Sequence, residues 1–332
     1  MSDIQKIASL ISTGQASRIT VLVGAGISTS AGIPDFRSPS SGLYTKLQKL
    51  HLPYPEAIFS LNYFRHTPEP FYAIARARNP GHVVPTISHA FLALLDRKGL
   101  VNILFTQNID GMEVGAGVGE GRVVAVHGSW RSQRCVKCKG VYPDELMGKA
   151  VQSGEVPYCE GEGCGGVVKP DIVMFGESLH VDFESLEKNV GDADMMIVMG
   201  TSLTVHPCTR LPRLVEKGVP RVLINREKVG DFGSREEDVC ILGGCDDGVR
   251  ELADALGWKD ELEELWKEIV AEKKAAVEGP DEGESIDVLI DRYAEKVKQE
   301  RMVSDGHKRM LEEHLGKKFA DVLVKPEKKV EA

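Results

Sequence analysis

Three features are missing from this 332-residue sequence: long apolar runs, a cationic apolar leader and an excess of basic residues. No stretch reaches the roughly 18 uninterrupted apolar residues of a membrane-spanning helix, so we expect no membrane partner. The N-terminal residues lack the charged start and apolar core of a secretory signal peptide. We therefore expect an intracellular protein whose thiols stay reduced.

The charge balance argues against one class of partner. With 41 Lys and Arg against 50 Asp and Glu, the formal net charge is −9. Proteins that bind duplex DNA neutralise its phosphates with basic residues, so we expect no direct nucleic-acid binding. Lysine-rich peptides remain compatible partners. The length predicts about two domains, and a hydrophobic fraction of 42% is typical of a soluble globular protein.

Short apolar runs recur along the chain, and helical patterns such as residues 89–96 lie between several of them. The runs are residues 19–23, 101–105, 123–126, 195–199 and 221–224. Strands that alternate with helices predict an α/β fold with a doubly wound parallel sheet. Four of the runs are followed at once by small or polar residues, in the segments GAGIS, TQNID, GTS and NRE. Ligands bind at the carboxyl ends of such strands, so these segments should surround one crevice.

A glycine-containing turn follows the first predicted strand. Residues 24–28 offer backbone N–H groups and a helix N-terminus, an arrangement that binds phosphate. Thr29 stands in place of the third glycine of the GxGxxG motif, and no acidic residue follows where a dehydrogenase places its ribose carboxylate. A tight strand–helix turn without a ligand is therefore the alternative. If a dinucleotide binds, we expect Asn225 and Glu227 to hold its ribose.

Four cysteines fall into two pairs. Two residues separate Cys135 from Cys138, and 20 residues further on, four residues separate Cys159 from Cys164. This spacing predicts a zinc ribbon. Four thiolates complete a tetrahedral Zn²⁺ site and leave no position for water, so we expect a structural zinc ion and no metal-assisted hydrolysis. The three other cysteines have no partner spacing and are expected to be buried small hydrophobic residues.

Polar side chains end two further strands. His127 follows the run 123–126 on the expected ligand side, where it can serve as a general base; a structural histidine is the alternative. At the neighbouring strand end stand two amides and a carboxylate, those of Gln107, Asn108 and Asp110. The amides can recognise a carboxamide, and ordinary turn chemistry is the alternative.

Taken together, these segments resemble the sirtuin family. The resemblance rests on GAGIS at 24–28, AGIPDFR at 31–37, TQNID at 106–110, His127 with Gly128, the four cysteines, KPDIVMFGE at 169–177, GTSL at 200–203 and NRE at 225–227. GLY at 42–44 and HLPYPEAIF at 51–59 resemble the class I branch nearest the mainly cytoplasmic sirtuin. Two apolar departures are Met112, where Leu is usual, and Met174, where Phe is usual.

The resemblance implies an activity. Sirtuins remove acetyl and other acyl groups from protein lysines; they consume NAD and release nicotinamide and an O-acyl-ADP-ribose. For this chain it implies NAD as co-substrate, one structural Zn²⁺, and acetyl-lysine substrates such as histones, tubulin or other proteins. It also implies a cytoplasmic location, with the nucleus as a second compartment.

The resemblance further implies roles for single residues. His127 is expected to be the catalytic base, with Asn108 as a second catalytic residue. The residues expected to bind the cofactor are Ala25, Gly26, Ile27, Ser28, Thr29, Asp35, Phe36, Arg37, Gln107, Asn108, Ile109, Asp110, Thr201, Ser202, Asn225, Arg226, Glu227 and Cys245. Those expected to pair with the substrate peptide as an added strand are Val173, Phe175, Gly176 and Glu177.

Resemblance and composition together divide the chain. We expect an N-terminal helix in residues 1–17, a catalytic domain over 18–257 and a charged helical tail over 258–332. The Rossmann part of the catalytic domain comprises 18–38, 82–127 and 176–257, and its smaller lobe comprises a helical module at 39–81 and a zinc ribbon at 128–175. The tail keeps an apolar stripe over 262–276 and 286–303, so we expect it to dock on the folded body.

Three other functions stay open. They are a zinc-containing dehydrogenase, which would produce NADH; a non-enzymatic zinc-ribbon module; and mono-ADP-ribosyl transfer to protein on the same fold.

The residue three places after Tyr72 bears on which acyl groups the protein is expected to remove. The desuccinylase branch of the family carries Tyr-x-x-Arg, whereas Tyr72 here is followed three places on by Ala75. A carboxylate would therefore lose its hydration without gaining a partner, and we expect aliphatic acyl groups to be preferred over succinyl. The apolar residues expected to form the acyl channel are Ile33, Phe36, Leu43, Phe59 and Phe71.

Overall fold

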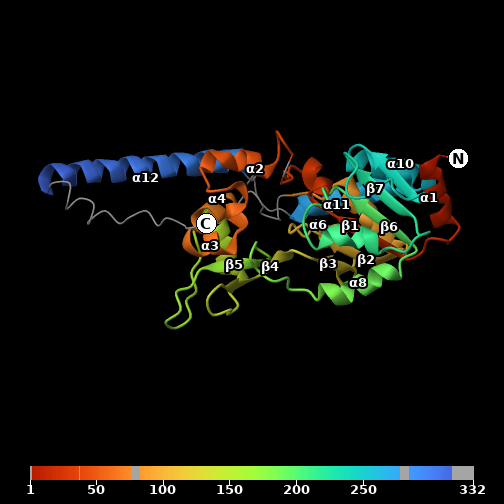
Figure 1. Ribbon diagram of the computed structural model, residues 1–332, viewed down its shortest axis with the longest axis horizontal. Helices are drawn as coiled ribbons and strands as arrows, with labels where there is room; N and C mark the ends of the chain where they lie inside the picture. Colours follow the sequence, from red (N-terminus) through yellow and green to blue (C-terminus); the bar gives the residue numbers. More distant parts are fainter. Residues whose placement is uncertain (1, 37, 76–82, 277–283, 316–332) are drawn as a thin grey trace.

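The structure, a computed structural model, describes residues 2–36, 38–75, 83–276 and 284–315, and for 301–315 only the helix that they form. A six-stranded, fully parallel sheet is the centre of the larger lobe (Figure 1). The strands are β1 Ile19–Val23, β2 Val101–Thr106, β3 Val123–Ala125, β6 Met195–Met199, β7 Arg221–Asn225 and β8 Asp238–Leu242. Their spatial order is β3-β2-β1-β6-β7-β8. This is the 3-2-1-4-5-6 order of dinucleotide-binding folds, and its switch point lies between β1 and β6.

The sheet explains why its strands read as continuous apolar runs. Val21 belongs to the apolar cluster on one face, and its neighbour Leu22 belongs to the cluster on the other. Successive side chains of a strand point to opposite faces, so a sheet that is covered on both sides needs apolar residues throughout. The predicted α/β class and five of the strands are confirmed.

One strand of this sheet, β8, lies after the last of the five predicted runs and was not predicted. The strand β8 lies at the edge of the sheet, begins with an acidic residue and alternates between buried and partly exposed positions. Its first residue, Asp238, forms an ion pair with Arg221, whose side chain is fully buried at the start of β7. The pairing of these two charges is a tertiary contact that local pattern does not reveal.

Helices cover both faces of the sheet (Figure 1). The helices α1 Asp3–Ser12, α5 Ile87–Arg97 and α10 Cys245–Leu256 pack on one face, and α8 Phe183–Gly191 and α9 Leu211–Leu214 pack on the other. The N-terminal helix expected in residues 1–17 is α1, which covers only Asp3–Ser12 and begins with a capping box between Ser2 and Gln5. Short elements near the carboxyl edge are η1 Ala25–Ala31, α6 Met112–Gly115, η5 Glu120–Arg122 and η6 Cys208–Arg210.

The smaller lobe combines two segments that are far apart in the sequence. One contributes α2 Leu43–Lys46, η2 Leu47–Leu50, η3 Pro55–Phe59, α3 Leu61–His66 and α4 Glu69–Ala75; the other contributes the antiparallel pair β4 Gly128–Cys135 and β5 Val168–Ile172 with α7 Asp144–Ser153. They share one apolar core. Phe71 of α4 stacks on Trp130 of β4 with ring centroids 5.7 Å apart.

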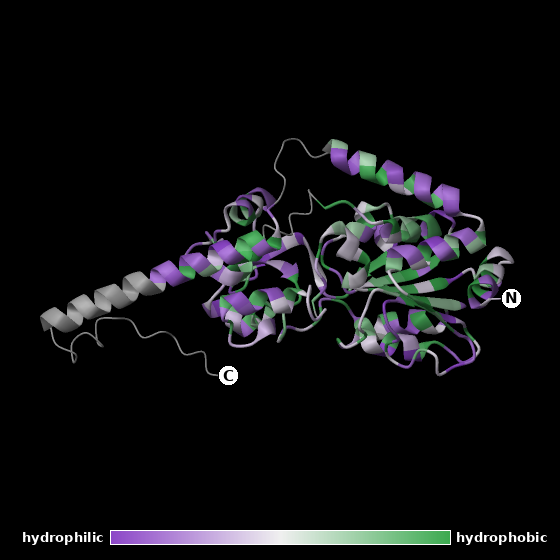
Figure 2. Ribbon diagram, turned by 90° about the horizontal axis from the view of Figure 1, so that it is seen from above, coloured by the Kyte–Doolittle hydropathy of each residue, from purple (hydrophilic) through white to green (hydrophobic). Residues whose placement is uncertain are grey.

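The charged tail packs on both lobes. Helix α11, Lys259–Ala276, buries Leu262, Leu265 and Ile269 against the larger lobe. Helix α12, Ile286–Leu315, buries Ile286 and Ile290 in the core of the smaller lobe, and Figure 2 shows the two helices lying over different lobes. The described part of the tail docks as its apolar stripe predicts, and residues 301–303 of that stripe lie outside the residues whose side chains are described. In the described part of the chain, no helix combines the length and apolarity that crossing a membrane requires.

Candidate active site

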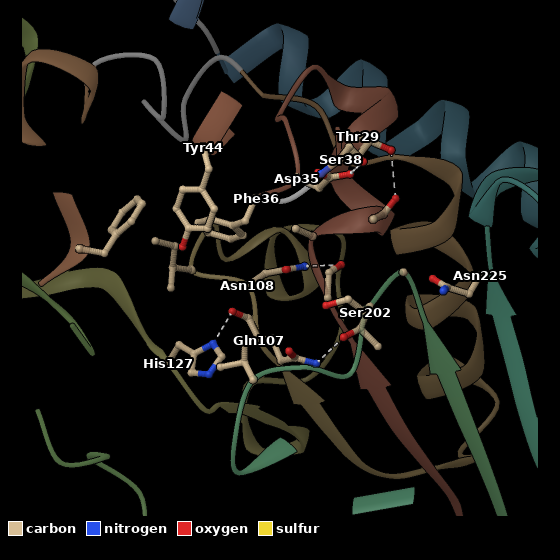
Figure 3. A pocket seen from close by; sticks show the side chains of 18 of the residues that line it. Thr29, Asp35, Phe36, Ser38, Tyr44, Gln107, Asn108, His127, Ser202 and Asn225 are labelled. Carbon is tan, nitrogen blue, oxygen red and sulfur yellow. Dashed lines mark hydrogen bonds between the residues drawn. The ribbon is translucent and has the colours of Figure 1, made fainter. Parts of the chain in front are cut away.

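A cavity of about 630 Å³ opens at the carboxyl ends of the central strands, between the two lobes (Figure 3). This is within the volume range of ligand sites. The segments after β1, β2, β6 and β7 all contribute to its wall, as the sequence predicted. The smaller lobe closes it with residues after β5 and around η3.

The turn after β1 needs its glycines for packing. A Cβ atom on Gly24 would lie 2.8 Å from the carbonyl oxygen of Gly200, and one on Gly26 would lie 2.6 Å from the Gly200 Cα. These two turns therefore pack backbone against backbone at the switch point, where ligands of such sheets bind. The helix that follows is the 3₁₀ element η1 and not an α-helix. Gly24, Ala25 and Gly26 line the cavity, so the tight turn is present where the ligand was expected, and phosphate binding by its backbone stays a prediction.

His127 is held by one nitrogen and presents the other. Its Nδ1 lies 2.8 Å from the carbonyl oxygen of Gln107, which can only accept, so Nδ1 carries the ring proton. The Nε2 atom is buried without a hydrogen-bond partner among the described residues, and His127 lines the cavity. Burial lowers the pKa of His127 below 6.5, which outweighs the opposing effect of the Gln107 carbonyl. The ring is therefore a neutral proton acceptor at physiological pH.

Asn108 is fixed in a similar way. Its Nδ2 donates to the carbonyl oxygen of Gly24 and to Oε1 of Glu113, both at 3.3 Å. Both amide hydrogens are thus directed into the protein, and the amide oxygen is left for the cavity that Asn108 lines (Figure 3). The side chain of Gln107 donates to Thr201 Oγ1 at 2.9 Å, which ties the end of β2 to the end of β6.

The other predicted cofactor residues divide into two groups. Those that line the cavity are Ala25, Gly26, Thr29, Asp35, Phe36, Gln107, Asn108, Ile109, Thr201, Ser202, Asn225, Arg226, Glu227 and Cys245. Ile27, Ser28 and Asp110 lie behind the wall: Ile27 is a core residue, and Ser28 donates to Asp110 at 2.9 Å. Arg37 lies outside the described residues.

The segment predicted to bind substrate lies on the opposite wall. Val173, Phe175, Gly176 and Glu177 all line the cavity. The N–H of Val173 donates to the His127 carbonyl oxygen, and that of Phe175 donates to the Phe59 carbonyl oxygen, both at 2.8 Å. The Glu177 side chain accepts from Met174 N–H and pairs with the buried Lys169 at 3.0 Å. These bonds fix the segment to both parts of the smaller lobe.

The cavity includes residues that the sequence did not identify. They are Ser38, Pro39, Tyr44, Ile172, Leu179, Val205, His206, Gly243 and Gly244. Gly243 and Gly244 follow β8, so recognising that strand would have placed them by the same edge rule. Of the predicted acyl channel, Phe36 and Phe59 line the cavity, with ring centroids 5.7 Å apart, whereas Ile33, Leu43 and Phe71 are buried behind them.

The four paired cysteines meet in the smaller lobe. Cys135 Sγ lies 3.6 Å from Cys164 Sγ, and Cys138 Sγ lies 3.7 Å from Cys159 Sγ. All four sulfur atoms lie within 4.8 Å of one another. A disulfide needs sulfur atoms about 2.05 Å apart, so these are free thiols. Tetrahedral Zn–S bonds of about 2.3 Å place sulfur atoms roughly 3.8 Å apart, so the cluster fits Zn²⁺.

The remaining cysteines are isolated from the cluster. Cys208 and Cys245 are buried, and Cys240 is partly buried. Burial raises the pKa of Cys208 and of Cys245 to about 12, so both stay protonated. The prediction of buried small residues is confirmed for these two, although Cys245 also lines the cavity.

A ligand cavity at the switch point of a 3-2-1-4-5-6 sheet defines this chain as a dinucleotide-binding α/β protein. The four-cysteine cluster further indicates one of those dinucleotide-binding proteins that carry a structural metal ribbon. Residues 24–207 match the Sir2 family, and the chain belongs to this family.

Three named relatives are similar over most of the chain. The NAD-dependent protein deacetylase hst2-2 of Emericella nidulans is 52% identical over 322 residues, which span 95% of this chain and 91% of that protein. The NAD-dependent protein deacetylase hst2 of Schizosaccharomyces pombe is 48% identical over 263 residues, 79% of each chain. The NAD-dependent protein deacetylase sirtuin-2 of Danio rerio is 45% identical, over 80% of this chain and 74% of that protein.

Proposed function

We propose that this chain is an NAD-dependent protein lysine deacetylase. The observation that carries the proposal is the buried, unpartnered Nε2 of His127, which faces a cavity built at the dinucleotide switch point of the described chain. The similarity to proteins named NAD-dependent protein deacetylases supports it. Among the described residues that line the cavity, no Ser or Cys is hydrogen-bonded to His127, so the histidine is available to act on a bound ligand.

The cavity residues fit NAD as co-substrate. The backbone of residues 24–26 reaches the wall without side chains in the way, because glycines flank Ala25. Asn225, Arg226 and Glu227 place polar groups at the far end, where they support binding of the adenosine half. Asn108 offers its amide oxygen at the near end, where we place nicotinamide and its ribose.

When bound, NAD supplies an electrophilic ribose carbon with nicotinamide as its leaving group. The chain's own contribution is to position and to exchange protons. Because the Gln107 carbonyl holds Nδ1, His127 accepts a proton at Nε2. We place the acetyl-lysine peptide as an added strand along residues 173–177, beside His127, and its acyl group against Phe36 and Phe59.

The finer assignments are part of the same proposal. The products are nicotinamide and O-acyl-ADP-ribose, longer aliphatic acyl groups are accepted, and the substrates are acetylated proteins such as histones or tubulin. We further propose a cytoplasmic location, with the nucleus as a second compartment, and no direct binding of nucleic acid. The net charge of −9 supports the last point.

The direct test is mass spectrometry of an acetyl-lysine peptide incubated with the protein, with and without NAD. We expect loss of one acetyl group only with NAD, matched by one released nicotinamide. Formation of NADH would instead identify a dehydrogenase, and a gain of one ADP-ribose mass on protein would identify ADP-ribosyl transfer. An unchanged peptide in the presence of NAD would contradict the proposal.

A further inference from the structure

A cluster of three titratable side chains, two of them fully buried, lies directly behind the cavity wall. A ring nitrogen of His89 on α5 and carboxyl oxygens of Asp110 and Glu113 lie within 4.8 Å of one another. The exposed fraction of Glu113 is 1% and that of His89 is 0%. Nε2 of His89 and Oε2 of Glu113 have no hydrogen-bond partner among the described residues. His89 has no part in the proposed reaction, and Glu113 takes part only through its hydrogen bond with Asn108.

The donors that reach the two carboxyls are all neutral. Glu113 Oε1 accepts from Thr106 Oγ1 at 2.6 Å and from Asn108 Nδ2 at 3.3 Å. Asp110 accepts from Ser28 Oγ at 2.9 Å and from the N–H of Met112 at 3.0 Å. Glu113 is buried and Asp110 is partly buried, and ionising both carboxyls side by side without a cation is unfavourable, so the arrangement favours a proton on one of them.

The hydrogen bonds identify which carboxyl is neutral. Both oxygens of Asp110 accept hydrogen bonds, whereas Oε2 of the fully buried Glu113 accepts none from the described residues. A proton on Oε2 leaves Oε1 free to accept from Thr106 and Asn108. Burial, followed by the repulsion of Asp110, raises the pKa of Glu113 above its ordinary value.

His89 does not compensate the missing charge. Its Nδ1 lies 3.2 Å from the Thr86 nitrogen and 2.8 Å from the Thr86 hydroxyl oxygen, which holds the ring at the start of α5. Burial lowers the pKa of His89, against the influence of Asp110 and of Asp246 on α10. The cluster therefore contains a neutral His89 and a Glu113 whose carboxyl takes up a proton more readily than that of an exposed glutamate.

We propose that Glu113 is a positioning residue that, as a neutral carboxylic acid, orients the Asn108 amide so that its oxygen faces the nicotinamide end of NAD. This inference rests on the proposed function. Its basis is that both hydrogens of Asn108 Nδ2 are taken up behind the wall, one by Gly24 and one by Glu113. Without the second acceptor, the amide is free to rotate and to present N–H groups to the cavity.

Two substitutions distinguish this role from others. In Glu113→Gln, the amide mimics the neutral acid, because its oxygen can still accept from Thr106 and Asn108. Glu113→Ala removes the acceptor. Glu113→Asp moves the acceptor away from Asn108, because its side chain is shorter, and it serves as the test if the alanine variant does not fold. Glu187→Gln is the matched control, since Glu187 of α8 is a partly buried glutamate that pairs with Arg210 away from the cavity.

The readouts are the Kd of NAD and of AMP by calorimetry without peptide, followed by kcat and KM for an acetyl-lysine peptide. We expect Glu113→Ala and Glu113→Asp to weaken NAD roughly tenfold, the loss of about one hydrogen bond. They should leave AMP unchanged, because AMP occupies only the adenosine half. Glu113→Gln and Glu187→Gln should bind NAD within about twofold of the parent.

Two results would overturn the proposal. If Glu113→Gln weakens NAD as much as Glu113→Ala does, the carboxyl acts as an anion. If Glu113→Ala and Glu113→Asp both bind NAD normally, Glu113 positions nothing. Failure of the proposed function gives a different result: the unsubstituted protein would bind NAD but leave the acetylated peptide intact, or would not bind NAD at all.

Discussion

At the scale of single residues, the site is built by hydrogen bonds that leave one selected atom free. The Gln107 carbonyl engages Nδ1 of His127 and leaves Nε2 without a partner among the described residues. Gly24 and Glu113 engage the amide nitrogen of Asn108 and leave its oxygen. In both side chains, the hydrogen bonds made on the side away from the cavity determine which atom is available to a bound ligand.

His127→Ala should lower kcat for deacetylation by about 10²–10⁴-fold, because it removes a positioned proton acceptor. The Kd of NAD and the melting temperature should change little, since the substitution removes a single hydrogen bond from the fold. His66→Ala is the matched control: His66 also bonds a backbone carbonyl through Nδ1 but lies on the surface. Near-normal turnover by a folded His127→Ala protein would contradict the role of this residue.

The pH dependence of turnover should reflect the same side chain. Burial lowers the pKa of His127 below 6.5, so the neutral, proton-accepting ring persists to a lower pH than that of an exposed histidine. As pH falls through this lowered pKa, protonation removes the acceptor and kcat decreases. The measurement is kcat against pH between about 5 and 8 at saturating NAD. An acidic limb with its midpoint above 6.5 would show that another group controls the rate.

At the scale of elements, the sequence predicted those parts whose pattern is local. The apolar runs of β1 and β6 are unambiguous because both faces of the sheet are covered. The strand β8 was not predicted because it is an edge strand whose first residue, Asp238, is explained only by the buried Arg221. Likewise, nothing local indicates that Glu113 contacts Asn108, since that contact depends on how α6 folds back onto the end of β2.

The metal cluster is an element whose contribution is structural. Cys135 is buried where β4 ends, and its partner Cys164 is 29 positions further along the chain. A Zn²⁺ ion would therefore hold together segments that are far apart in the sequence, and its binding would contribute to folding. Zinc removal with a chelator, or Cys135→Ser, should lower the melting temperature by roughly 10 °C and reduce activity in parallel.

The control for the zinc experiment is Cys240→Ser, which changes a partly buried cysteine outside the cluster. It should alter neither zinc content nor melting temperature by much. Full activity and unchanged melting of a verified zinc-free protein would show that the cluster is not needed for the fold.

We expect η3 and its neighbours to set the acyl preference. Phe36 and Phe59 give the cavity an apolar wall, and Tyr72, which would begin a carboxylate clamp, is fully buried and donates to the Val168 carbonyl oxygen. A succinyl carboxylate would lose its hydration here without a partner. We expect kcat/KM for acetyl-lysine and longer aliphatic acyl-lysine peptides to exceed that for succinyl-lysine by at least about a hundredfold. Comparable values would contradict the assignment of the apolar wall.

At the scale of the whole molecule, the tail connects the two lobes that enclose the cavity. Helix α11 buries three apolar side chains on the larger lobe, and α12 packs on α4 and η2 of the smaller lobe. Lys46 and Lys49 pair with Asp287 and Asp291 of α12, although ion pairs that water can reach contribute little to stability. The docking of α12 therefore rests mainly on its apolar residues, such as Ile290.

Two truncations separate the contributions of these helices. Ending the chain after Trp258 removes both, and ending it after Ala276 keeps α11. Loss of α11 exposes the surface under Leu262, Leu265 and Ile269, so the first truncation should lower the melting temperature by roughly 5–10 °C relative to the second.

Loss of α12 also removes the contacts that hold η2, and η2 continues directly from α2. The N–H groups of Leu43 and Tyr44 in α2 donate to the carbonyls of Asp35 and Phe36, which line the cavity. We therefore expect both truncations to change the KM for NAD or for the peptide. If α12 instead joins two copies of this chain, both truncations should change the mass of the protein in solution. Unchanged kinetics, mass and melting temperature in both would show that the tail is a surface appendage without influence on the site.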